Sequence, residues 1–170
     1  YKVIMVKLII LFTVSMLCIN VSNAKISEEE VSFLNSVFKD DIPKKKRLIV
    51  KKDAQENIKR IMGDTYNKRL FSYWEDNDSK VWILNSIGKY KPITAGFVVN
   101  DCKIKSSHVI VYREAHGYEI KFPSFLLQFT DAQIDNNMKL NLKVDNISGA
   151  TLSVNSMQRM AKTALLLTKL

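Results

Sequence analysis

Residues 140–170 read LNLKVDNISGATLSVNSMQRMAKTALLLTKL and contain three local patterns in succession. Residues 140–144 alternate apolar and polar side chains, which predicts a half-buried strand. Residues 153–170 place apolar side chains at helical spacing, which predicts an amphipathic C-terminal helix. The buried face of this helix is expected to contain Val154, Met157, Ala161, Ala164 and Leu165. The segment between strand and helix, residues 145–151, is the candidate functional site.

Small residues in this connecting segment lead to a hydroxyl at the start of the helix. Gly149 can adopt backbone angles that are closed to other residues, and Ser148 and Ala150 leave space beside the chain. The first amides of a helix are unpaired donors at the positive end of its dipole, so they would meet a phosphate held on Thr151. An ordinary helix cap at Thr151 after a glycine turn is the alternative, and on the residues alone it is the commoner role.

The sequence upstream predicts two β-hairpins. Strands are expected at residues 69–75, 80–85, 93–99 and 103–112. The first hairpin turns at Asp-Asn-Asp-Ser, residues 76–79, and the second at Asn100 and Asp101, where a tight turn needs positive φ. The apolar segment 122–129 follows, with Pro123 suited to opening a helical turn.

Two helices are predicted nearer the N-terminus, over residues 28–39 and 54–62. Each follows a candidate capping box. The pairs are Ser27 with Glu30, and Asp53 with Glu56. Gly63 stands at the stop position of the second helix. The fold class expected from all these elements is α+β: an antiparallel sheet with packed helices and a C-terminal helix following Ser-Gly-Ala-Thr.

Composition limits the classes of function. The chain has 170 residues, 26 Lys+Arg against 17 Asp+Glu, and 46% hydrophobic residues, so we expect one folded domain rather than a disordered chain. Two cysteines and two histidines exclude a disulfide scaffold and a four-cysteine metal site, and we expect no metal. Cys102 is expected to be a buried, inert thiol.

Residues 1–24 have the layout of a secretory signal peptide. Two lysines precede an apolar run at residues 8–19, and Ser22 and Ala24 stand at −3 and −1 of a possible cleavage site. An uncleaved membrane anchor is the alternative, but the run is shorter than the roughly 20 residues of a spanning helix. We therefore expect an exported protein, in the periplasm or at the outer face of the cytoplasmic membrane.

The order of motifs resembles the FMN-binding domain family, which occurs in electron-transfer subunits of the sodium-pumping NADH:quinone reductase and its ferredoxin-oxidising relatives. The hallmark of that family is Asp, two variable residues, Ser or Thr, then Gly-Ala-Thr, and residues 145–151 match it throughout. Further similar segments are residues 88–94, the Glu-containing turn 112–117, and 125–129 with Gln128. The layout of residues 1–24 and the resemblance together divide the chain into a signal peptide (1–24), an N-terminal helical region of unknown role (25–74) and an FMN-binding domain (75–170).

The resemblance implies that FMN is joined to Thr151 through a phosphoester bond. It also implies a maturation partner, a flavin transferase that uses FAD and Mg²⁺ and releases AMP. On this interpretation Asp145, Ser148, Gly149 and Ala150 form both the recognition signal of the transferase and the phosphate site.

The Glu-containing turn lies beside the flavin in that family, so the resemblance assigns Glu114 and Gly117 as cofactor contacts. A solvated rim charge is the alternative for Glu114. Tyr118 and Met157 are possible neighbours of the flavin ring, although a role in the core is favoured for both.

The predicted function is electron transfer between membrane-bound or periplasmic redox proteins, with no substrate of its own. A non-redox exported binding module with a vestigial flavin site is one alternative. A Ser/Thr hydrolase is another, but it needs a base and only His108 and His116 are available. The basic cluster 44–52 is interpreted as a solvated linker that contacts no nucleic acid; anionic lipid or an acidic redox partner are its other candidate contacts.

Overall fold

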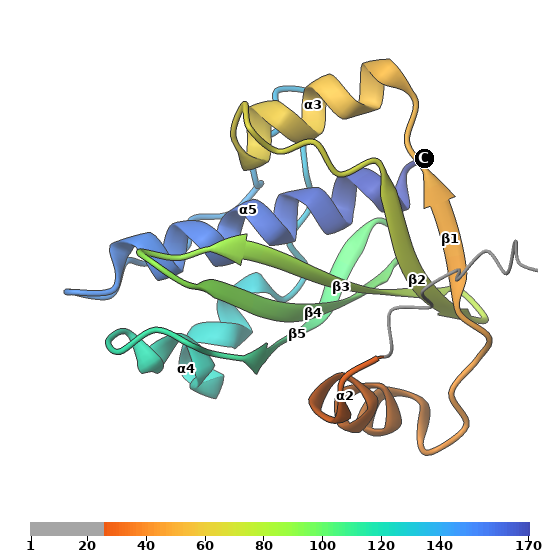
Figure 1. Cartoon of the computed structure of the whole chain (residues 1–170), viewed down its shortest axis with the longest axis horizontal. Coiled ribbons are helices and arrows are strands. Elements are labelled where there is room, and N and C mark those ends of the chain that lie inside the picture. The colour runs from red at the N-terminus through yellow and green to blue at the C-terminus, as the bar shows by residue number, and fades with distance from the viewer. Residues whose placement is uncertain (1–25) are drawn as a thin grey trace, which may run out of the picture.

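A computed structural model describes residues 26–170, which form a five-stranded sheet with helices on both faces (Figure 1). The strands are β1 (Lys46–Ile49), β2 (Leu70–Asp76), β3 (Ser79–Ile87), β4 (Pro92–Asn100) and β5 (Lys103–Val111). They lie in chain order, and every neighbouring pair is antiparallel. The helices are α2 (Glu28–Phe38), α3 (Lys52–Met62), α4 (Pro123–Leu126) and α5 (Thr151–Thr168), with short 3₁₀ segments at Tyr118–Lys121 and Leu127–Phe129. The predicted α+β class is confirmed.

The two predicted hairpins are present. The first turns at Asn77, whose φ is 48°, between the paired residues Asp76 and Ser79. The second turns at Asp101 and Cys102, with φ of 50° and 55°. The predicted turn was one residue too early, because Asn100 is the last residue of β4 and pairs with Lys103.

The thiol of Cys102 is exposed, so the expectation that it is buried is wrong. Cys102 lies in the two-residue turn between β4 and β5, and the tip of a tight hairpin projects into solvent rather than into the core.

Strand β1 was not predicted. It lies within the basic cluster interpreted as a linker, and it pairs with β2 at the edge of the sheet. Lys46 Nζ also lies 2.6 Å from Glu75 Oε2 across this pair. A short, charged edge strand discourages pairing with other chains. Residues 25–74 are therefore not wholly helical, and the sheet continues across the predicted boundary at residue 75.

Helix α5 packs on one face of the sheet, mainly over β3 and β4, with α3 beside it (Figure 1). The main core lies here, and its largest fully buried side chains include Trp82, Phe97 and Met157. Helix α3 begins at Lys52 after an N-cap, Lys51, that makes no side-chain bond, so the predicted Asp53–Glu56 capping box is wrong. The predicted stop at Gly63 is confirmed.

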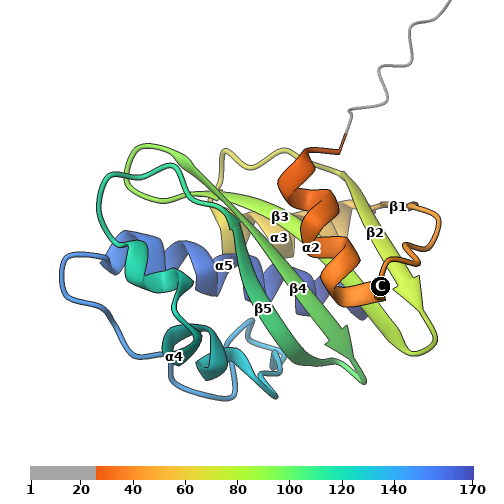
Figure 2. The same cartoon turned by 90° about the horizontal axis from the view of Figure 1, so that it is seen from below.

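Helix α2 covers the opposite face of the sheet (Figure 2). Its predicted capping box is present: Glu30 N donates to Ser27 Oγ at 3.2 Å, and Ser27 N donates to Glu30 Oε2 at 2.9 Å. Phe33 and Leu34 pack against Trp74, Val81 and Val98 in a second, smaller core.

Residues 112–150 contain little regular structure, and their short helical segments contact β5. The expected helical turn after Pro123 is present as α4. The predicted strand at residues 140–144 is wrong, since only Leu140 forms an isolated bridge, to Ile134. Leu140, Leu142 and Val144 do point into the main core, which explains the alternation without a neighbouring strand.

The predicted signal peptide, residues 1–24, lies outside the described residues. Within residues 26–170, no helix has the length and apolar character needed to cross a membrane.

Candidate functional site

Helix α5 begins at Thr151, with Ala150 as its N-cap. Because alanine has no polar side-chain atom, no side-chain bond caps the helix, and its first turn contains no acidic residue. Thr151 is exposed, and its Oγ1 accepts a hydrogen bond from Asn146 Nδ2 at 2.8 Å. The alternative role of Thr151 as helix cap is therefore wrong. An uncapped helix N-terminus with an exposed hydroxyl beside it is suited to binding an anion.

Gly149 gives the segment before α5 its shape. Its φ is +79°, and an added Cβ would meet no atom within 4 Å. The position therefore requires the backbone freedom of glycine and not its small size. Ala150 N donates to Ile147 O at 2.9 Å across the same turn, which brings Ser148 and Thr151 to the same side of the chain as lining of one pocket.

Gly117 packs against the start of α5. Its φ is +89°, and an added Cβ would lie 2.8 Å from Tyr112 Oη and 2.9 Å from the Cβ of Ala150. Tyr112 reinforces this contact, since its hydroxyl donates to His116 O and lies 3.1 Å from Ser153 Oγ. Two segments far apart in sequence, the turn after β5 and the N-terminus of α5, are thus held together by a glycine, an alanine and one tyrosine hydroxyl.

Glu114 connects the same turn to the loop between β3 and β4. Its Oε1 accepts hydrogen bonds from Tyr90 N at 2.7 Å and Lys91 N at 2.8 Å. The amides of Lys91 and Tyr90 hold the pKa of Glu114 below its ordinary value. The carboxylate therefore orders the loop that forms the other wall of the site, in addition to lining it.

These segments enclose one pocket of about 740 Å³, a size typical of cofactor sites. Its lining includes six of the seven residues that the sequence analysis assigned: Glu114, Gly117, Ser148, Gly149, Ala150 and Thr151. Asp145 is exposed and does not line the pocket; its amide donates to Gln128 Oε1 at 2.7 Å. A role for Asp145 in recognition by the transferase stays a prediction.

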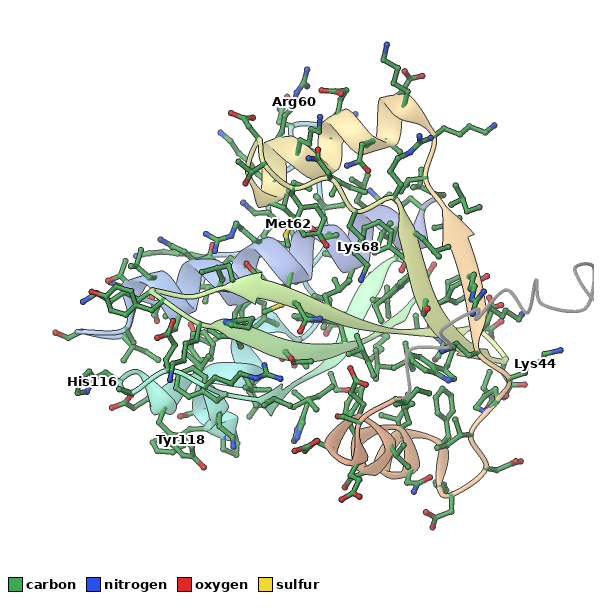
Figure 3. All side chains as sticks on the ribbon, in the orientation of Figure 1. Lys44, Arg60, Met62, Lys68, His116 and Tyr118 are labelled. Atoms are coloured by element: carbon green, nitrogen blue, oxygen red, sulfur yellow. The ribbon has the colours of Figure 1, made fainter. Side chains whose placement is uncertain are left out.

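Two tyrosines give the pocket exposed aromatic surface. Tyr118 is 54% exposed and Tyr90 is 76% exposed, so the expectation that Tyr118 belongs to the core is wrong. Met157 is fully buried, which confirms the core role favoured for it. Figure 3 places Tyr118 and His116 at the end of the molecule where α5 begins.

The sequence analysis missed several lining residues. They are Lys89, Tyr90, Ala115, Glu119, Leu152 and Ser153, together with Asn146 beside the hydroxyl. Lys89 and Tyr90 fall inside the segment 88–94 that resembles the opening of the family domain, so that segment was the available signal. Asn146 occupies a variable position of the family hallmark, so the sequence contained no signal for it.

The arrangement gives no support to a hydrolase. His116 lines the pocket, but among residues 26–170 no hydrogen bond joins it to Thr151 or Ser148. His108 lies on β5, where its ring stacks on Phe33 at 5.6 Å between centroids. Neither histidine is placed as a base for these hydroxyls.

The residues fit a flavin mononucleotide. The uncapped N-terminus of α5 provides amide donors for a phosphate, Lys89 adds a positive charge, and the tyrosines offer apolar and aromatic surface for a planar ring. The exposed hydroxyl of Thr151 lies at this N-terminus, in the wall of the pocket.

Comparison with known proteins agrees with this fit. Residues 88–166 match the family model described as FMN-binding domain, a range that runs from the loop before β4 into α5 and contains the whole pocket lining. No curated protein matches the chain. Residues 88–166 thus match the FMN-binding domain family, and FMN is the cofactor that this domain indicates.

Proposed function

We propose that this protein is an exported flavoprotein that carries FMN through a phosphoester to Thr151. It shuttles electrons between redox partners at the outer face of the cytoplasmic membrane. One observation carries the proposal: within a domain of the FMN-binding family, the Thr151 hydroxyl is exposed at the uncapped N-terminus of α5, in the wall of the pocket. The signal-like layout of residues 1–24 supports export.

Attachment needs a maturation partner, the flavin transferase with FAD and Mg²⁺. Thr151 Oγ1 forms the new bond to the phosphorus of the FMN half of FAD, the bond from that phosphorus to the AMP half breaks, and AMP leaves. The amides at the start of α5 then face the attached phosphate, and Lys89 offers a counter-charge. Asp145 and Ser148 are exposed and accessible to the transferase.

The remaining pocket residues orient the cofactor and leave it accessible. Bound FMN supplies the electron-transfer chemistry, and linkage through its phosphate leaves the ring system unmodified. Tyr90, Tyr118 and Leu152 are exposed lining residues, so a ring bound among them keeps an edge near solvent, where a redox partner can approach. A covalent bond also prevents loss of the cofactor from a protein that has no cytoplasmic pool to draw on.

Denaturing gel electrophoresis after co-expression with a flavin transferase tests the attachment. Flavin fluorescence should migrate with the protein band, and it should be absent from Thr151→Ala. Thr130→Ala is the matched control, because Thr130 is an exposed threonine that does not line the pocket. Fluorescence that persists in Thr151→Ala, or a colourless wild-type protein, contradicts the proposal, and the second result favours the vestigial binding module.

Export is tested separately by osmotic shock. Release of a shortened chain with the periplasmic fraction supports a cleaved signal peptide, whereas retention in membranes after a high-salt wash supports an uncleaved anchor. Release by salt alone points to contact through the basic cluster 44–52. Recovery only in the cytoplasmic fraction contradicts export.

A further inference from the structure

The hydroxyl to be modified already has a fixed neighbour. Asn146 Nδ2 donates a hydrogen bond to Thr151 Oγ1 at 2.8 Å, and both residues are exposed. Within residues 26–170, this is the one hydrogen bond made by the Thr151 hydroxyl. The position of Asn146 is therefore linked directly to the atom that takes part in flavin attachment.

The backbone gives no reason for asparagine at position 146. The positive-φ residues of the described chain include Asp131, Met138 and Gly149, but not Asn146. A turn that needs no left-handed residue here tolerates most side chains. The conspicuous feature of Asn146 is the contact of its side chain with Thr151.

This contact restricts the orientation of the hydroxyl. In helices, threonine divides between two χ1 rotamers, because Oγ1 can also bond to a carbonyl three or four residues earlier. An amide N–H only donates, so it occupies one lone pair of Oγ1 and leaves the hydroxyl proton and the other lone pair free. Asn146 therefore selects the rotamer in which Oγ1 faces the amide and remains open to attack phosphorus.

We infer that Asn146 is a positioning residue for flavin attachment, which holds Thr151 Oγ1 in its reactive orientation. The inference rests on the proposed function. As the Oγ1–phosphorus bond forms, AMP departs with the electrons of the broken bond. The hydroxyl proton passes to a base of the transferase. No atom changes its oxidation state in this step. The amide of Asn146 touches neither FAD nor AMP. It acts through the threonine, whose ester oxygen remains an acceptor afterwards.

The rate of attachment tests this role. The full chain, purified free of flavin, is incubated with the transferase, FAD and Mg²⁺ at several chain concentrations, and the gain in intact mass is followed with time. Asn146→Ala should lower kcat by about threefold to tenfold, the loss expected for one neutral hydrogen bond, with KM for the chain changed by less than about twofold. Asn146→Asp should be at least as slow, because a carboxylate cannot donate and repels phosphate.

Asn136→Ala is the matched control, an exposed asparagine in another loop, and it should react at the wild-type rate. A raised KM with unchanged kcat in Asn146→Ala would make Asn146 a contact for the transferase and overturn the inference. An unchanged rate in Asn146→Ala, or a wild-type rate in Asn146→Asp, overturns it as well.

A second measurement is independent of the transferase. Three-bond scalar couplings should report one χ1 rotamer for Thr151 in the wild-type chain and rotamer averaging in Asn146→Ala. Equal couplings in the two proteins overturn the inference even when Thr151 is flavinylated normally. If the couplings differ as expected but the wild-type chain never gains flavin, the proposed function has failed and the positioning role in attachment falls with it.

Discussion

Gly117 and Ala150 lie so close that a Cβ on Gly117 would stand 2.9 Å from the Cβ of Ala150. They belong to different walls of the pocket, one in the turn after β5 and the other at the start of α5. The two smallest residues thus meet where the chain must approach itself, and the turn that contains Glu114 lies against the start of α5, where Thr151 stands. Larger side chains at either position would separate the walls.

Gly117→Ala should destabilise the fold by about 1–3 kcal/mol, because it adds a clash to the strain of a positive φ. It should also reduce flavin loading, since the clash lies in the pocket wall. Urea unfolding and the absorbance of bound flavin measure the two effects. Gly63→Ala is the control, with φ +111° but open space around the added Cβ. Equal losses of stability and equal loading in the two variants would show that the contact with Ala150 has no special importance.

The pH dependence of the loop between β3 and β4 should follow Glu114. Hydrogen bonds from Lys91 N and Tyr90 N lower the pKa of this carboxyl below 4.5. A lowered folded-state pKa means that the stabilisation is complete above the unfolded value and disappears as the pH falls through the folded one. The amide chemical shifts of Tyr90 and Lys91 should therefore titrate at a midpoint below 4.5.

Glu114→Gln should abolish that titration, because the amide does not ionise. Glu119→Gln is the control, since Glu119 lines the same pocket but its side chain accepts no hydrogen bond from the described residues. A midpoint at or above 4.5 in the wild-type protein, or an unchanged titration in Glu114→Gln, contradicts the assignment.

The buried and exposed faces of helix α5 should differ in what they contribute to the stability of the fold. Met157 is fully buried, so Met157→Ala should lower the free energy of unfolding by about 2–5 kcal/mol. Leu152 is 46% exposed and lines the pocket, so Leu152→Ala should change stability by less than about 0.5 kcal/mol. Chemical denaturation gives both values. An unchanged free energy of unfolding in Met157→Ala would show that Met157 does not contribute to the core. A large decrease in Leu152→Ala would show that Leu152 does.

The hairpins and α2 were predictable because their signals are local. Alternating side chains and turn residues indicate β2 to β5, and Ser27 with Glu30 indicates the start of α2. Strand β1 has no such signal, since its four residues, Lys-Arg-Leu-Ile, do not alternate and the strand forms by pairing with β2. Residues 140–144 show the opposite case: they alternate but form no strand. Alternation indicates which side chains are buried and not whether a partner strand exists.

The candidate site also contains residues that the sequence predicts and residues that it does not. Residues 145–151 are contiguous, so their pattern was visible in the sequence, and the family resemblance gave Glu114 and Gly117. Lys89 and Tyr90 line the pocket from a loop that is hydrogen-bonded to Glu114, a tertiary contact across more than twenty residues. No local periodicity encodes that contact.

The most direct test of the central claim is the mass of the peptide that contains Thr151, taken from protein matured with a flavin transferase. The account predicts a gain of one FMN less one water on that peptide, fragmentation that places the gain on Thr151, and no gain in Thr151→Ala. An unmodified peptide from the matured wild-type protein, or the same gain located on Ser148, would contradict it.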